Sequence, residues 1–228
     1  MKVVSIVIPA YNERDTVDAI LNSVSNIRVP GWKREIIVVD DGSTDGTNDV
    51  LSKWKKKIRV LSLPKNYGKG AALAKGFQYA KGDVILIQDA DTEYSPNDYK
   101  GLLAPFENDR VYVVYGSRFL GSHLSTMYLY AVGNKFVTWI TNVLYNTNIT
   151  DMETGYKVFR RSVLDHIVIS AKRFDFEPEF TAKALRAGYQ IYEVPISYFG
   201  RKFSEGKKLT WRDGVIALWT LLRCRFFS

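Results

Sequence analysis

Three acidic side chains, Asp89, Asp91 and Glu93, stand at every second position after an apolar segment. While the chain stays extended, side chains two residues apart point to the same side, so these acids would repel one another unless a cation lay among them. Carboxylate oxygens are hard ligands, and with only two histidines in the chain they favour Mg²⁺ or Mn²⁺. We therefore predict a divalent-metal site of the kind that bridges the phosphates of a substrate. The alternative is a solvated acidic turn after a strand.

Polar side chains also follow three other segments that the sequence predicts to be strands. Tyr11 and Glu13 follow the first segment, Asp41 follows the second and Arg118 follows the fifth, while the three acids follow the fourth. In an open parallel sheet the carboxyl ends of the strands lie at one edge, and ligands bind beyond them. The sequence therefore predicts one site at that edge, with carboxylates, a tyrosine and an arginine.

The order of strands and helices indicates the fold that positions these residues. Apolar β-rich runs alternate with apolar residues at helical spacing through the first half of the chain. The runs predicted to be strands are residues 3–8, 35–39, 58–61, 83–88 and 111–115. This alternation predicts an α/β fold with a Rossmann-like, mostly parallel central sheet and helices on both faces. In the less regular second half we expect a helix at 180–188, a strand at 190–194 and a last helix from 210.

Size and composition favour one globular domain, residues 1–228. The chain has 228 residues, of which 46% are hydrophobic and 25% charged, so it can bury a substantial core and is not disordered in composition. A single cysteine, Cys224, excludes a disulfide framework within the chain and fits a reducing compartment. Neither a signal peptide nor a run of about 18 apolar residues is visible, so we expect neither secretion nor a membrane span.

The net charge of +8 favours anionic partners such as phosphates, nucleotides, nucleic acid or an acidic membrane surface. The excess is uneven, because residues 200–228 carry seven basic and two acidic side chains, which gives +5. Neither a P-loop nor a dinucleotide-binding glycine motif is present. The glycines of residues 66–70 precede a helix, whose N-terminus could hold an anion with the help of Lys69; a tight turn is the alternative.

Four motifs occur together in one order along the chain: residues 4–13 read VSIVIPAYNE, 38–45 read VVDDGSTD, 66–70 read NYGKG and 89–91 read DAD. In these motifs the chain resembles family 2 of the glycosyltransferases, which have the GT-A fold. The resemblance is strong over residues 3–120. Within the family it looks most like the branch that contains dolichyl-phosphate mannose and glucose synthases and their bacterial polyprenyl-phosphate relatives. Three further segments carry that assignment, residues 116–118, 151–156 and 201–208.

The resemblance implies a nucleotide-sugar site in residues 1–120 and an acceptor site in residues 121–228, with an amphipathic last helix. The donor-binding residues it implies are Pro9, Ala10, Tyr11, Glu13, Val39, Asp41, Lys69, Asp89, Ala90 and Asp91. Asp89 and Ala90 would contact the ribose or the metal shell, and Asp91 and Glu93 would bind the ion on the diphosphate. Some members of the family carry glutamine where Glu93 stands. Transfer would invert the sugar carbon, and the metal would stabilise the leaving nucleotide.

The nature of the acceptor decides which further residues are needed. A hydroxyl acceptor needs a general base, and Asp151 is the best candidate, ahead of Glu177 and Glu179. A lipid phosphate is already an anion at neutral pH and needs cations to position it instead. We predict that Arg118, Arg201 and Lys207 bind phosphate. The predicted catalytic residues are Asp91, Glu93, Arg118 and Asp151.

We therefore expect an inverting, metal-dependent hexosyltransferase that uses UDP-glucose or GDP-mannose and a polyprenyl or dolichyl phosphate. The alternatives are a family relative that glycosylates a hydroxyl group, and a binding protein for nucleotide-sugars or nucleic acid. Acids at a strand end would repel nucleic acid, so we expect no such partner. The last helix and the aromatic segment 122–147 suit a membrane surface, with a buried helix pair as the alternative. We expect a cytoplasmic enzyme, peripheral on the inner membrane face, and predict no particular oligomeric state.

Overall fold

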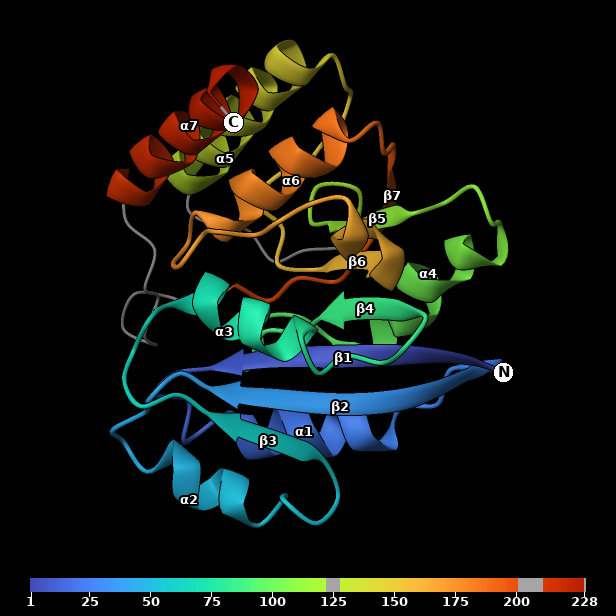
Figure 1. Cartoon of the computed structure of the whole chain (residues 1–228), viewed down its shortest axis with the longest axis vertical. Coiled ribbons are helices and arrows are strands. Elements are labelled where there is room, and N and C mark those ends of the chain that lie inside the picture. The colour runs from blue at the N-terminus through green and yellow to red at the C-terminus, as the bar shows by residue number, and fades with distance from the viewer. Residues whose placement is uncertain (122–127, 201–210, 228) are drawn as a thin grey trace.

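A seven-stranded sheet runs through the molecule, in the order β3-β2-β1-β4-β6-β5-β7 (Figure 1). The computed structural model describes residues 1–121, 128–200 and 211–227. Its strands are β1 Lys2–Ala10, β2 Trp32–Asp40, β3 Arg59–Ser62, β4 Val84–Ile87, β5 Val113–Ser117, β6 Lys157–Arg160 and β7 Ile191–Pro195. Four of the neighbouring pairs are parallel, and β6 is antiparallel to both β4 and β5. The predicted α/β fold with a mostly parallel sheet is confirmed.

The sequence analysis missed β6, the strand that lies between β4 and β5. Only two of its four residues are apolar, Val158 and Phe159, and a basic residue stands at each end, so no strand pattern is visible. Because β6 runs against its neighbours, it begins at the edge where β4 and β5 end. The segment before it, residues 151–156, is thereby brought to the edge where we predicted the site.

Helices cover both faces of the sheet, because successive strand residues point to opposite sides. Val4, Ile6 and Ile8 of β1 pack on one side with α1, α2 and α4, and Val7 packs on the other with α3 and α6. All four side chains are fully buried, as expected for a sheet covered on both faces. The helices are α1 Val17–Asn26, α2 Thr47–Ser52, α3 Lys69–Phe77, α4 Tyr99–Leu103, α5 Tyr128–Tyr145, α6 Phe176–Arg186 and α7 Trp211–Phe226, with 3₁₀ turns at Pro96–Asp98, Ala104–Glu107 and Arg161–Asp165.

Helices α5 and α7 form an outer layer beyond α6, at one end of the molecule (Figure 1). Their inner faces meet α6 in a small apolar cluster that includes Val137 of α5, Ala182 of α6 and Leu221 of α7. Within the described residues, no helix combines the length and the apolar character needed to cross a bilayer.

Candidate functional site

The predicted edge of the sheet gathers loops from both halves of the chain. The ends of β1, β2, β4, β5 and β7 and the start of β6 all lie there. The sequence analysis placed residues after β1, β2, β4 and β5 at this edge, and the topology agrees. Residues before β6 and after β7 join them; the sequence analysis had selected Asp151 for the site but had not predicted β6, which brings it to this edge.

Asp41 organises the glycine-rich segment 66–70. It is almost fully buried, and its two carboxylate oxygens accept the backbone N–H groups of Tyr67, at 2.9 Å, and Gly68, at 2.7 Å. Burial raises the pKa of the Asp41 carboxyl, against the effect of the two N–H groups. Gly68 has a φ of 100°, and a Cβ there would lie 2.4 Å from the carbonyl oxygen of Lys172, so only glycine fits. The predicted contact of Asp41 with the nucleoside stays a prediction.

Two backbone N–H groups at the N-terminus of α3 are used within the protein. Gly70 donates its backbone N–H to the carbonyl of Arg173, at 3.3 Å, and Ala71 donates to that of Lys172, at 3.0 Å. These two donors are therefore used to fasten the segment before α6 onto α3. The tight turn at Gly68 is confirmed, and the predicted role of Lys69 with an anion stays a prediction.

Lys69 lies between two carboxylates. Its Nζ is 2.7 Å from Oδ1 of Asp89 and 2.8 Å from Oε1 of Glu177, and all three side chains are largely buried. Burial alone would lower the pKa of Lys69, but Asp89 and Glu177 outweigh it and raise that pKa above its usual range. With two carboxylates and one ammonium, this Lys69 cluster carries a surplus negative charge.

The three predicted metal ligands are close in sequence but have different partners. Asp89 binds Lys69, Asp91 Oδ1 accepts the N–H of Glu93, and Glu93 Oε2 accepts the hydroxyl of Tyr198 at 2.8 Å. Over the parts of the chain that the structure describes, no three acids, histidines or cysteines gather as a metal cage. The donor set still fits a hard cation, since Mg²⁺ is often held by one or two carboxylates together with substrate phosphates. The ligand set Asp89, Asp91 and Glu93 stays a prediction.

Arg118 and Asp151 form a second charged group, which we call the Arg118 pair. Nε and Nη2 of Arg118 each lie 2.7 Å from one oxygen of Asp151, and its backbone N–H donates to the same carboxylate at 3.0 Å. Asn134 of α5 adds a contact at 3.3 Å. Asp151 is fully buried, and its charge raises the pKa of Arg118 despite the opposing effect of burial. Both oxygens of Asp151 are thus occupied by donors.

Tyrosines that the sequence analysis did not select connect the two charged groups. The ring of Tyr198 lies 5.3 Å from the guanidinium of Arg118, and its hydroxyl binds Glu93. Tyr94 packs between Tyr156 and Tyr198, with ring centroids at 4.8 and 5.3 Å. A Cβ on the neighbouring Gly155 would lie 2.4 Å from Oδ2 of Asp89. In the sequence, the Gly155-Tyr156 dipeptide of the segment 151–156 was the signal that could have drawn attention to these residues.

Glu153 and Lys157 were also missed, and both lie at the start of β6. Oε1 of Glu153 is buried without a hydrogen-bond partner, whereas Lys157 donates to the carbonyls of Met152, at 2.7 Å, and Thr154, at 3.0 Å. Burial and the charge of Glu177 raise the pKa of Glu153, and burial lowers the pKa of Lys157. The opposite charge of Lys157 works against the rise in the pKa of Glu153, and the charge of Glu153 works against the fall in the pKa of Lys157.

The remaining predicted donor residues line the ends of β1 and β2. Glu13 accepts a hydrogen bond from the Thr16 hydroxyl at 2.8 Å, and its backbone N–H donates to Thr47 at 2.9 Å. Pro9, Ala10, Tyr11 and Val39 lie at or just after the ends of β1 and β2, Ala90 follows β4, and their roles with the donor stay predictions. The other two predicted phosphate ligands, Arg201 and Lys207, lie outside the described residues.

The sequence of this chain matches a family model and known bacterial proteins. Residues 5–168, well over half of the chain, match the family model described as glycosyl transferase family 2. The chain is 29% identical to the polyprenol monophosphomannose synthase of Mycolicibacterium smegmatis over 89% of this chain and 79% of the relative. It is also 29% identical to the undecaprenyl-phosphate mannosyltransferase of Micrococcus luteus, with 99% of both chains covered.

Solved structures support the fold. Glucosyl-3-phosphoglycerate synthase from Mycobacterium tuberculosis, solved with Mn²⁺, UDP and glucosyl-3-phosphoglycerate, superposes with a TM-score of 0.76. That match covers 100% of this chain and 81% of the synthase at 21% identity. At this identity the likeness shows a shared α/β architecture and nothing finer.

Proposed function

Because this chain belongs to glycosyl transferase family 2, we propose that it transfers a hexose from a nucleotide-sugar to a polyprenyl phosphate, with inversion at the sugar carbon. The names of the two bacterial relatives, a polyprenol monophosphomannose synthase and an undecaprenyl-phosphate mannosyltransferase, support this acceptor class. We assign the donor to residues 1–120 and the acceptor to residues 121–228. We propose that the transferred sugar is glucose or mannose.

The Arg118 pair is the observation that carries the proposal. A hydroxyl acceptor needs a base, but the carboxylate of Asp151 accepts three hydrogen bonds from Arg118 and a fourth from Asn134. Both oxygens of Asp151 are therefore already engaged by protein donors and are poorly placed to take the proton of an acceptor hydroxyl. A phosphate acceptor needs no base, since its second pKa is near about 6. Such an acceptor instead needs a fixed cation, and the pair holds Arg118 rigidly in that role.

On the donor side, Asp91 and Glu93 would hold a divalent cation, with Asp89 next to them. When bound, that Mg²⁺ or Mn²⁺ would stabilise the charge that develops on the leaving diphosphate. The presence of Mn²⁺ and UDP in the structurally similar synthase is consistent with this assignment. Lys69, whose charge is compensated by Asp89 and Glu177, holds Asp89 in position through a 2.7 Å contact.

The acceptor class also implies a location. A polyprenyl phosphate resides in a membrane, so the enzyme must work at a bilayer surface. We assign it to the inner face of the membrane as a peripheral protein, in line with the excess of basic residues in the last part of the chain.

The test is a transfer assay with labelled UDP-glucose or GDP-mannose, Mg²⁺ or Mn²⁺, and undecaprenyl phosphate. We expect label in the organic phase that requires both the metal and the phosphate group. Undecaprenol, which has a hydroxyl in place of the phosphate, is the matched control and should give no product. Equal transfer to undecaprenol, or hydrolysis of the donor alone, would contradict the proposal.

A further inference from the structure

Helix α5 presents its apolar side to the outside of the molecule. Five large apolar side chains, spaced four, four, three and four residues apart, are exposed: Tyr128, Val132, Phe136, Trp139 and Val143. This spacing places them along one side of the helix. Surface helices ordinarily turn such a stripe toward the core, so this one needs an explanation.

Besides Val137, which joins the apolar cluster, the inner side of α5 carries polar side chains that contact the site and the loop before β6. Asn134 donates to Asp151, and Thr138 donates to Asn134 at 3.2 Å and accepts the N–H of Met152 at 3.1 Å. Further along, Asn142 binds the backbone of Ile149 in both directions, at 2.8 and 3.0 Å. These contacts fix the rotation of the helix, so the outward apolar stripe is part of the fold.

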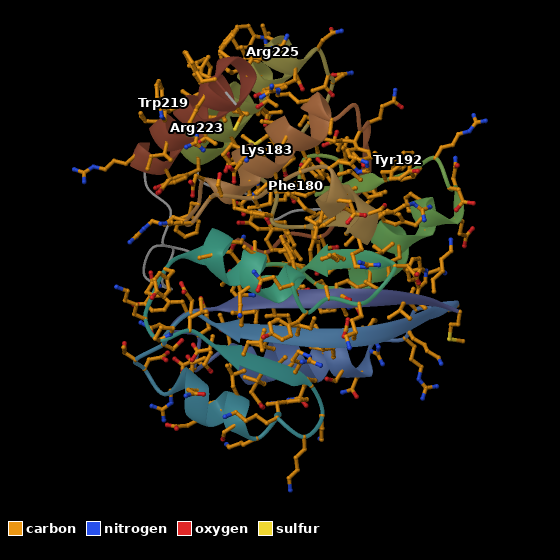
Figure 2. All side chains as sticks on the ribbon, in the orientation of Figure 1. Phe180, Lys183, Tyr192, Trp219, Arg223 and Arg225 are labelled. Atoms are coloured by element: carbon orange, nitrogen blue, oxygen red, sulfur yellow. The ribbon has the colours of Figure 1, made fainter. Side chains whose placement is uncertain are left out.

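Helix α7 carries a matching stripe. Val215, Ile216, Trp219, Leu222 and Phe226 are exposed, whereas Ala217, Leu221 and Cys224 are buried. Figure 2 shows Trp219 on the outer side of α7. Both helices pack by their inner faces on the same apolar cluster, so both stripes face away from α6. We call these ten side chains the α5–α7 face.

The charges on the two helices indicate what covers this face. Arg223 lies 3.7 Å from the buried Glu179 of α6, and the two helices otherwise carry Lys135, Arg212 and Arg225 against a single acid, Asp213, a net charge of +2. A second copy of the same face would bring like charges together, which opposes self-association. Tryptophans and tyrosines mixed with arginines are typical of helices that lie in the interface of an anionic bilayer.

We infer that the α5–α7 face docks on an anionic lipid bilayer and thereby sets the distance between the site and the acceptor. Asn134 links the inner side of α5 directly to the Arg118 pair. One helix diameter, about 10 Å, therefore separates the bilayer from the proposed phosphate-binding arginine. A polyprenyl phosphate could reach Arg118 while its chain stays in the membrane. This inference rests on the proposed function for the identity of the acceptor.

The test is co-sedimentation of the full chain with vesicles of phosphatidylcholine, alone or mixed with phosphatidylglycerol. We expect binding that is stronger on the mixed vesicles. The double variant Trp139→Gln with Trp219→Gln should bind about tenfold or more weakly, because both side chains are more than half exposed and would lose their contact with lipid. Tyr192→Gln is the matched control: Tyr192 is 52% exposed, close to the 57% of Trp139, and lies apart from Trp219 in Figure 2.

A second readout separates this inference from the proposed function. With a short-chain polyprenyl phosphate in solution, the double variant should transfer sugar as fast as the unmodified chain; with undecaprenyl phosphate in vesicles it should be slower by about the loss in binding. Vesicle binding that depends on Trp139 and Trp219 supports the docking surface even if no acceptor is glycosylated. Equal vesicle binding by the double variant overturns it. A dimer in solution that the double variant dissociates, without vesicle binding, also overturns it.

Discussion

Lys69 and Arg118 are buried cations at the same edge of the sheet, and they differ in how their charges are paired. Lys69 is a point charge between two carboxylates, at 2.7 and 2.8 Å, and its cluster has a surplus negative charge. Arg118 is matched one to one with Asp151 through two parallel contacts of 2.7 Å, which leaves a neutral pair. The first arrangement can accept one more cation; the second holds an arginine in a fixed orientation.

This difference gives the Lys69 cluster and the Arg118 pair different chemistry within one site. Under the proposed function, a metal that arrives with a diphosphate would meet the carboxylates near Lys69, whereas the acceptor phosphate would meet the guanidinium of Arg118 near Asp151. Tyr198 touches both regions, since it donates to Glu93 and lies against Arg118. Substitutions in the Lys69 cluster and in the Arg118 pair test whether the two groups are as different as their geometry suggests.

The largest expected effect comes from breaking the Arg118 pair. Asp151→Asn removes the charge that compensates Arg118 and should lower the free energy of unfolding by about 3–5 kcal/mol, measured by urea denaturation. Its control is the double variant Arg118→Met with Asp151→Leu, which should recover most of that stability but transfer no sugar. If the double variant transferred sugar normally, Arg118 would have no role with the acceptor.

Removing the cation of the Lys69 cluster should cost less. In Lys69→Met, Asp89 and Glu177 lose their shared donor, and we expect a loss of about 1–3 kcal/mol in the free energy of unfolding. Donor turnover should fall because Asp89 is no longer held. Lys75→Met is a matched control, since Lys75 lies on the same helix as Lys69 but its ammonium contacts the ring of Tyr79. The same activity in both variants would show that Lys69 has no part in donor binding.

Glu179 supports the Lys69 cluster indirectly, through the segment that caps α3. Its buried carboxylate accepts the N–H groups of Ser170, at 3.0 Å, and Ala171, at 2.6 Å, and fastens the segment that caps α3. Although burial opposes it, hydrogen bonding from Lys183, Ser170 and Ala171 lowers the pKa of Glu179. Figure 2 shows Lys183 on α6, the helix that also carries Glu179, and Arg223 on the neighbouring α7.

A depressed folded-state pKa gives stability that is present above the unfolded value, about 4.3, and is lost as the pH falls through the folded value. Glu179→Gln should therefore be less stable than the unmodified chain at pH 7 by about 1–3 kcal/mol, and the difference should shrink below about pH 4. Thermal unfolding of both proteins across this range is the measurement. A difference that stayed constant with pH would show that the carboxylate charge is irrelevant.

The smallest changes add a single methyl group, at one glycine inside the site and at one glycine outside it. Gly155→Ala places a Cβ 2.4 Å from Asp89 and should reduce transfer at least about tenfold, at a cost of about 1–3 kcal/mol in stability. Gly101→Ala, in α4, meets nothing within 4 Å and should keep full activity, with a gain of about 0.5–1 kcal/mol. Kinetics and urea denaturation of the pair check both expectations.

The sequence was informative where periodicity and strand order were enough. The five strands of the first half were predicted within a few residues, and the acids after β4 and Arg118 after β5 were placed at one edge correctly. Glu177 was rated a weak candidate because two acids at a helix start are common. Only the contact with Lys69, more than 100 positions away in the chain, shows that it belongs to the site.

The amino-acid sequence by itself determined the α/β fold, the family and the edge where the acids lie, because hydrophobic periodicity and short motifs are local properties. The tertiary structure decided which charges meet. It inserted β6 between β4 and β5, which brought Asp151 to Arg118 and Gly155 to Asp89. It also decided which way α5 faces, because the rotation of a helix follows from the polar contacts of Asn134 and Thr138 with a distant loop.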